Sequence, residues 1–134
     1  MLKATLHSDG GARGNPGPAG IGFVLAIEKR EPIKIGVYIG ETTNNQAEYQ
    51  ALYGGLMKAQ AEGVTSIDCY LDSELVVKQI KGIYRMKNAE LRPWFEKIQA
   101  LKTTFSHISF NHVMREKNKL ADQLVNEAID KKLK

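Results

Sequence analysis

The chain has 134 residues, of which 43% are hydrophobic and 25% charged, and its net charge is +4. This length and composition predict one globular domain over residues 1–134, built on a single core. No apolar run reaches the roughly 18–20 residues of a membrane span, and the first residues lack a signal-peptide core, so we expect a cytoplasmic protein without membrane contact.

Three predicted strands, joined by short turns, occupy the first part of the chain. They cover residues 3–7, 20–27 and 33–41, with turns at "GNPGP" and "KREP". Strands connected this closely form an antiparallel meander. The segment between the first two, "SDGGARGNPGPAGIGF", is rich in glycine and proline. It is either an ordinary hairpin turn or a backbone that comes close to a large ligand.

The pattern then changes to a helical period over residues 42–63, with Asn44 or Asn45 as the N-cap and Gly63 at its end. Cys69 lies in the next, apolar strand, where it has no disulfide partner and is expected to be buried. The later elements are strand 66–73, helix 74–82, helix 88–105 (Pro93 near its start), strand 107–113 and helix 118–134. The order βββαβααβα predicts an α/β fold: a five-stranded mixed sheet, with three antiparallel N-terminal strands, flanked by helices.

Four acidic residues stand at unusual places in these elements. Asp9 and Asp72 end two predicted strands, where ligands collect in open α/β sheets. Glu48 falls on the apolar face of helix 42–63, and Asp122 lies at the edge of the apolar stripe of the last helix. The ordinary alternatives are turn or cap roles for the two aspartates at strand ends, and ion pairs with lysines for Glu48 and Asp122.

If the four carboxylates converge, protons or cations must relieve their repulsion. Oxygen ligands without a supporting His or Cys cluster favour Mg²⁺ or Mn²⁺. Two such ions can activate water and stabilise the leaving oxygen of a phosphoryl displacement. Residues 78–119 add ten Lys/Arg against three Asp/Glu, which suits a bound polyanion, although a solvated helix face has the same composition. The pattern indicates a nucleic-acid phosphodiester as substrate.

Four segments, "SDGGARGNPGPAGIGF", "TTNNQAEYQAL", "YLDSELVVKQIKG" and "REKNKLADQLVNEA", together resemble type 1 ribonuclease H, in the order and spacing of that family from about residue 3 to residue 130. The resemblance implies an endoribonuclease that cuts the RNA strand of RNA–DNA hybrids and leaves 5′-phosphate and 3′-hydroxyl ends. It also implies two Mg²⁺ ions, with Mn²⁺ as a possible substitute, held by Asp9, Glu48, Asp72 and Asp122.

The same resemblance implies a set of substrate-binding residues. The backbone at Gly10, Gly11 and Gly14 would approach the minor groove of the hybrid. Side-chain contacts to the hybrid are implied for Asn15, Asn44 and Asn45, and a pocket for a DNA phosphate is implied at Thr43 and Asn88.

The chain departs from many members of the family in two places. "HVMREKNK" leaves no room for the loop that carries a histidine in those members, so His112 is assigned to its strand and Arg115 to the catalytic site as the substitute. The basic protrusion is shortened to "GIYRMKNAEL", while Trp94 and Phe95 have the spacing of core residues.

Two other functions stay open at this point. One is a hybrid-binding module of the same fold with feeble catalysis, which the complete set of four acids disfavours. The other is a DNA enzyme of the transposase, integrase or resolvase type, which the "TTNNQAE" segment disfavours. We expect a monomer in either case.

Overall fold

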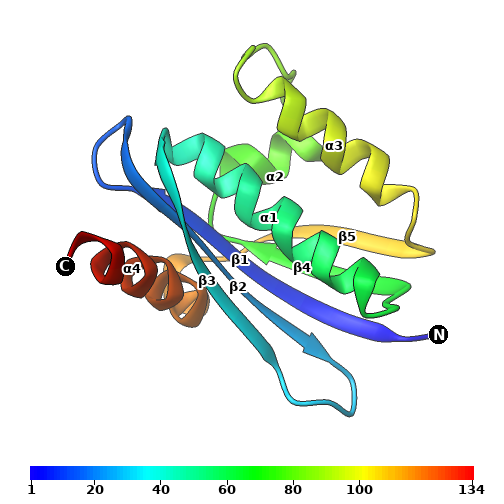
Figure 1. Cartoon of the computed structure of the whole chain (residues 1–134). Helices are drawn as coiled ribbons and strands as arrows, with labels where there is room; N and C mark the ends of the chain where they lie inside the picture. The colour runs from blue at the N-terminus through cyan, green and yellow to red at the C-terminus, as the bar shows by residue number, and fades with distance from the viewer.

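Five strands form one mixed sheet in the order β3-β2-β1-β4-β5 in the computed structural model, which describes residues 1–134 (Figure 1). The meander consists of β1 (Lys3–Ala12), β2 (Gly17–Ile27) and β3 (Ile33–Thr42), each antiparallel to the next. On the other side of β1, β4 (Ser66–Leu71) and β5 (His107–His112) run parallel to it. The predicted fold class is confirmed.

Helices cover both faces of this sheet. On one face lie α1 (Asn44–Ala61), α2 (Glu74–Ile80) and α3 (Arg92–Lys102); on the other, α4 (Lys119–Leu133) follows a short 3₁₀ turn, η1 (Arg115–Lys117) (Figure 1). α1 packs mainly on β1 and β2, and α4 mainly on β2 and β3. None of these helices combines the length and the apolar character that crossing a membrane requires.

The core lies between the sheet and the first three helices. Alternate residues of β1 and β4 point into it, among them Leu6, Ile67 and the free Cys69, which are fully buried. Trp94 and Phe95 are partly buried and pack against this core, as their spacing predicts.

On the opposite face, α4 approaches the sheet so closely that its backbone touches a strand. A Cβ atom on Gly22 of β2 would lie 2.5 Å from the carbonyl oxygen of Ala121, which excludes any side chain there. Gly22 is also the residue of β2 that pairs with Asp9 of β1. One glycine therefore lies beside Asp9 and beneath the first turn of α4, which carries Asp122.

Several predicted boundaries are wrong, and three of them have a clear structural cause. The first strand does not end at Asp9, because pairing with β2 keeps β1 extended as far as Ala12. The cap of α1 is Thr43, whose hydroxyl accepts from the Gln46 N–H at 3.3 Å, and neither Asn44 nor Asn45. The helix predicted from residue 88 begins at Arg92, since the turn before it closes on the side chain of Asn88.

Candidate active site

The site forms where the parallel pairing of β1 with β4 stops. The last pair of that ladder is Ser8 with Leu71, and β4 ends there. Asp9 follows Ser8 within β1, and Asp72 follows Leu71, so the two acids leave the ladder side by side. From Asp9 onward, one edge of β1 has no strand partner on this side.

The first turns of α1 occupy that free edge. The Gly10 N–H donates to Glu48 Oε1 at 2.8 Å, and the Ala12 N–H donates to Asn44 Oδ1 at 3.2 Å. Four helical residues rise about 6 Å and two strand residues about 6.6 Å, so acceptors at positions i and i+4 of the helix match alternate donors of the strand. α1 thus replaces β4 as the hydrogen-bonding neighbour of β1, and this pairing holds the Glu48 carboxylate beside Asp9.

This arrangement requires glycine at position 10. A Cβ atom there would lie 2.2 Å from the backbone carbon and oxygen of Ala47, so a side chain would push α1 away. Gly10 therefore allows α1 to pack closely on β1. This role differs from the predicted one, which was an approach of the backbone to the substrate. Gly11 lies in the wall of the cleft and has no atom closer than 3.6 Å to such a position, whereas Gly14, with φ +104°, belongs to the hairpin turn.

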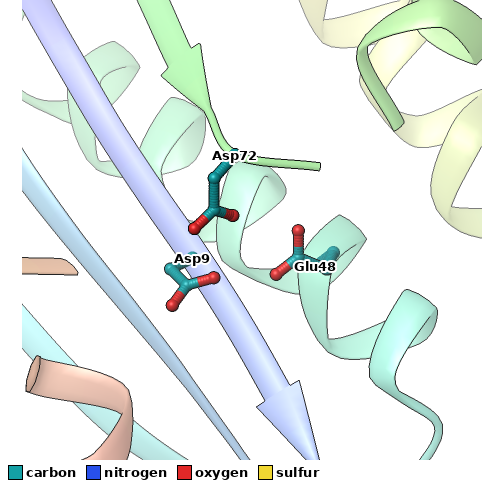
Figure 2. A group of neighbouring side chains, drawn as sticks. All are labelled: Asp9, Glu48 and Asp72. Carbon is teal, nitrogen blue, oxygen red and sulfur yellow. The ribbon is translucent and has the colours of Figure 1, made fainter. Parts of the chain in front are cut away.

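Three of the four predicted acids converge. Asp9, Glu48 and Asp72 each direct a carboxylate oxygen to a common point, where the three atoms lie within 4.8 Å of one another (Figure 2). Asp9 and Glu48 are only 7% and 5% exposed. Asp122, on α4, lines the same cleft but lies outside this group of three. No lysine or arginine forms an ion pair with any of the four, so the ion-pair alternative for Glu48 and Asp122 is wrong.

The electrostatics of the cluster favour a bound cation. Burial raises the pKa of Asp9, and the neighbouring Glu48 charge raises it further. Burial also raises the pKa of Glu48 and of Asp72, although the charge of Arg115 acts against both increases. Buried carboxylates with raised pKa values and no protein cation between them hold either protons or a metal ion. An oxygen-only donor set of this kind fits a hard divalent cation.

The cluster lies in a cleft of about 630 Å³ between β1, α1 and α4. Two cationic side chains line it, Arg13 and Arg115. The Arg115 side chain is exposed and forms no hydrogen bond or ion pair within the protein. His112 is exposed at the end of β5 and does not line the cleft, whereas Arg115 does.

The remaining predicted residues cluster around the start of α1. Asn15 Oδ1 accepts from the Asn44 N–H at 3.0 Å, which joins the β1–β2 hairpin to α1. Asn45 is partly buried and makes no hydrogen bond through its side chain. Thr43 caps the helix.

Asn88 lies in the loop before α3, where its Oδ1 accepts from the N–H groups of Glu90 and Leu91 at 2.8 and 3.2 Å. The Gln46 amide donates to the Glu90 carboxylate at 3.1 Å and ties that loop to the start of α1. Asn88 and Thr43, predicted to share a phosphate pocket, therefore belong to two segments that are bonded to each other.

Sequence reasoning missed two residues of this region. Asn118 is almost fully buried, and its Nδ2 donates to the Ser8 carbonyl at 2.9 Å, which fastens the start of α4 to the residue before Asp9. A polar residue just before the last helix is a signal that could have singled it out. Arg13 lines the cleft and is bonded to Asp130, 117 residues away, for which no local pattern exists.

Comparison with known proteins agrees with this geometry. Residues 7–128 match the family described as "Reverse transcriptase-like". A bifunctional protein of Mycobacterium tuberculosis is 39% identical over 131 residues, which are 96% of this chain and 36% of that protein. The chain thus spans about a third of the length of the first curated relatives that it matches.

Two solved structures are similar over almost their whole length. RNase H1 from Halobacterium salinarum superposes with a TM-score of 0.92 at 40% identity, covering 96% of this chain and 98% of that one. LC11-RNase H1, a compost metagenome protein solved in complex with an RNA/DNA hybrid, has a TM-score of 0.91 at 45% identity, with complete coverage of both chains. The sheet order, the acidic cluster and these matches together show that the chain belongs to the type 1 ribonuclease H family.

Proposed function

We propose that the chain hydrolyses the RNA strand of RNA–DNA hybrids and leaves 5′-phosphate and 3′-hydroxyl ends. The observation that carries this proposal is the convergence of Asp9, Glu48 and Asp72 within 4.8 Å, in an open cleft and without a protein cation between them. The similarity to an RNase H1 that was solved with an RNA/DNA hybrid supports the choice of substrate.

The metal in this proposal is Mg²⁺, two ions per site, with Mn²⁺ as a substitute. Asp9, Glu48, Asp72 and Asp122 would hold the ions, and the donor set of carboxylate oxygens suits either metal. When bound, the ions supply a nucleophile from water at neutral pH and neutralise the charge that develops on the phosphate.

The protein's own contribution is to fix Glu48 and the backbone beside Asp9 before the metal binds. The Gly10 N–H holds Glu48, and the Asn118 amide holds the backbone at Ser8, next to Asp9. The Arg115 guanidinium has no partner in the protein, so it is free to donate paired hydrogen bonds to the phosphate that is cut. It stays protonated at neutral pH and therefore does not serve as a base.

Binding of the hybrid would use the segments around the start of α1. Gly11, Asn15, Asn44 and Asn45 face the position of the minor groove in this proposal, where the 2′-hydroxyl distinguishes RNA from DNA. Thr43 and Asn88 would contact a phosphate of the DNA strand. The exposed basic side chains from the end of α2 to the first residue of α3 would add contacts that are independent of sequence; they are Lys81, Arg85, Lys87 and Arg92.

A single experiment tests the proposal. End-labelled RNA–DNA hybrid, duplex DNA and duplex RNA are incubated with the protein in EDTA, in Mg²⁺ and in Mn²⁺, with Asp72→Asn as the matched inactive control. We expect cleavage of the RNA strand of the hybrid alone, and only with metal. Binding of the hybrid without cleavage would instead indicate a binding module, and equal cleavage of duplex DNA would indicate a transposase-like enzyme.

Oligomeric state and location complete the proposal. We expect the active species to be a monomer, which size-exclusion chromatography with light scattering measures directly. A cytoplasmic location stays a prediction.

A further inference from the structure

Arg13 lies at one end of the cleft, and the proposed cleavage reaction gives this end of the cleft no role. It follows Ala12, the last residue of β1, and the cleft runs from the acidic cluster along α4 to Arg13 and Asn126. Arg115, the other cation of the cleft, belongs to η1, at the opposite end of α4. A polyanion lying in the cleft therefore meets a guanidinium on each side of the four acids.

The Arg13 guanidinium is engaged by α4 in the free protein. Its Nη1 donates to Asp130 Oδ1, and its Nη2 lies 3.4 Å from both the carbonyl oxygen and Oδ1 of Asn126. The side chains of Arg13 and Asp130 are 39% and 60% exposed. An ion pair this exposed contributes little, about two- to fivefold in an equilibrium constant, and it exchanges partners readily.

The hairpin does not need this ion pair to hold its shape. The Arg13 N–H donates to the Pro18 carbonyl at 2.8 Å across the turn, and Asn15 fastens the turn to Asn44. The side chain of Arg13 is thus available for another partner. The planar guanidinium matches phosphate oxygens as well as it matches a carboxylate, and a phosphate in the cleft is a diester that keeps its full negative charge.

We propose that Arg13 binds a backbone phosphate of the substrate beyond the acidic cluster, and that Asp130 competes with this phosphate for the guanidinium. The inference rests on the proposed function and adds to it a residue that sets substrate affinity, together with an acid that opposes it. Asp130 lies outside the cleft wall, so its only connection with the substrate in this scheme is through Arg13.

Competition predicts opposite effects for the two partners. Arg13→Ala removes a phosphate contact, so the hybrid dissociation constant should rise about tenfold, and the slope of its logarithm against the logarithm of salt concentration should fall by about 1. Asp130→Asn releases the guanidinium, so the dissociation constant should fall about two- to fivefold. In the double variant the gain should vanish, because no guanidinium remains to be released.

The measurement is fluorescence anisotropy of a labelled RNA–DNA hybrid in Mg²⁺, with every variant built on Asp72→Asn to prevent cleavage. Arg30 and Glu62 provide controls of the same charge, since they form an ion pair at 3.3 Å on the surface, where Glu62 also pairs with Lys58, and neither lines the cleft. Arg30→Ala and Glu62→Gln change the net charge by the same amounts as the test variants. We expect each of them to change the dissociation constant by less than about twofold.

Three results would overturn the proposal. If Arg13→Ala and Asp130→Asn both weaken binding and both lower the melting temperature, the pair is a clamp for α4. If Glu62→Gln strengthens binding as much as Asp130→Asn, only net charge matters. If Arg13→Ala binds as wild type does, the residue touches no substrate. Failure of the parent chain to bind and cut any hybrid would refute the proposed function itself, which the wild-type cleavage assay establishes separately.

Discussion

Replacing Gly10 with alanine tests whether α1 must lie this close to β1 for the acidic cluster to form. The new Cβ atom would lie 2.2 Å from the backbone carbon and oxygen of Ala47 and 2.5 Å from the N of Glu48, whereas ordinary contact begins at 3.4 Å. All three atoms belong to the backbone and cannot rotate away. The strand and the helix must therefore separate by about 1.2 Å, the difference between 3.4 and 2.2 Å.

The magnitude follows from two losses. Overpacking against a rigid backbone costs about 1–3 kcal/mol. A separation of that size also stretches the 2.8 Å bond from the Gly10 N–H to Glu48 beyond bonding range, and a hydrogen bond to a charged group contributes about 1.5–3 kcal/mol. Since the two losses share one displacement, they do not add fully. We expect the free energy of unfolding to fall by about 2–4 kcal/mol.

Two assays are needed. Urea unfolding in EDTA measures the free energy of unfolding of the metal-free protein, and calorimetric titration of folded protein without EDTA measures Mn²⁺ binding. Gly11→Ala is the matched control, because the nearest atom to its Cβ would be a Val125 methyl at 3.6 Å. We expect that control to unfold within about 0.5 kcal/mol of wild type, and Gly10→Ala alone to weaken Mn²⁺ binding. Equal stability of the two variants would refute the packing argument, and would return Gly10 to the role of an open backbone position facing the substrate.

Three further predictions concern the charged groups of the site. Asp9→Asn and Asp72→Asn should each lower the single-turnover cleavage rate at least ~10³-fold, and neither should melt below wild type in EDTA, because each removes repulsion from the cluster. Burial raises the pKa of Asp9, Glu48 and Asp72 in the folded state, so the folded protein binds protons more tightly than the unfolded chain. Stability of the metal-free protein should therefore fall as pH rises above about 4, and calorimetric melting in EDTA at pH 5 and pH 8 should show less change for Asp9→Asn than for wild type. Arg115→Ala should lower turnover about ten- to a hundredfold, with partial recovery in Arg115→Lys, while His112→Ala, exposed and outside the cleft, should cleave at the wild-type rate in the same steady-state assay.

The element order and the acidic residues could be predicted from the sequence because both depend on local pattern. Alternation and helical period identify the strands and helices, and Glu48 is conspicuous as a carboxylate on the apolar face of a helix. The predicted strand end at Asp9 is wrong, because a run of glycines is typical of a turn. Only pairing with β2, a contact between segments apart in the sequence, keeps those residues extended as far as Ala12.

Other features had no local signal. β1 pairs with β4 up to Ser8 and with α1 from Gly10 onward. This change of neighbour depends on where β4 ends and on how closely α1 approaches, and tertiary packing sets both. The cap of α1 is similar: three polar residues in succession are each suited to it, and the link from Asn15 to the N–H of Asn44 sets the register that makes Thr43 the cap. Arg13 and Asp130 become neighbours only when the complete sheet brings the hairpin to α4.

The contact of Gly22 with α4 has a consequence for how this site tolerates sequence change. Gly22 pairs with Asp9, and a Cβ atom on Gly22 would lie 2.5 Å from the carbonyl oxygen of Ala121, the residue before Asp122. At this contact the main chain of β2 lies directly against the main chain of α4, with the Leu124 Cβ beside it. Main-chain dimensions are the same whatever the sequence, so we expect substitutions in the core on the far face of the sheet to change the distance between β2 and α4 little. The distance between Asp9 and Asp122 therefore depends on position 22 remaining glycine, because any side chain there would push α4 away from β2.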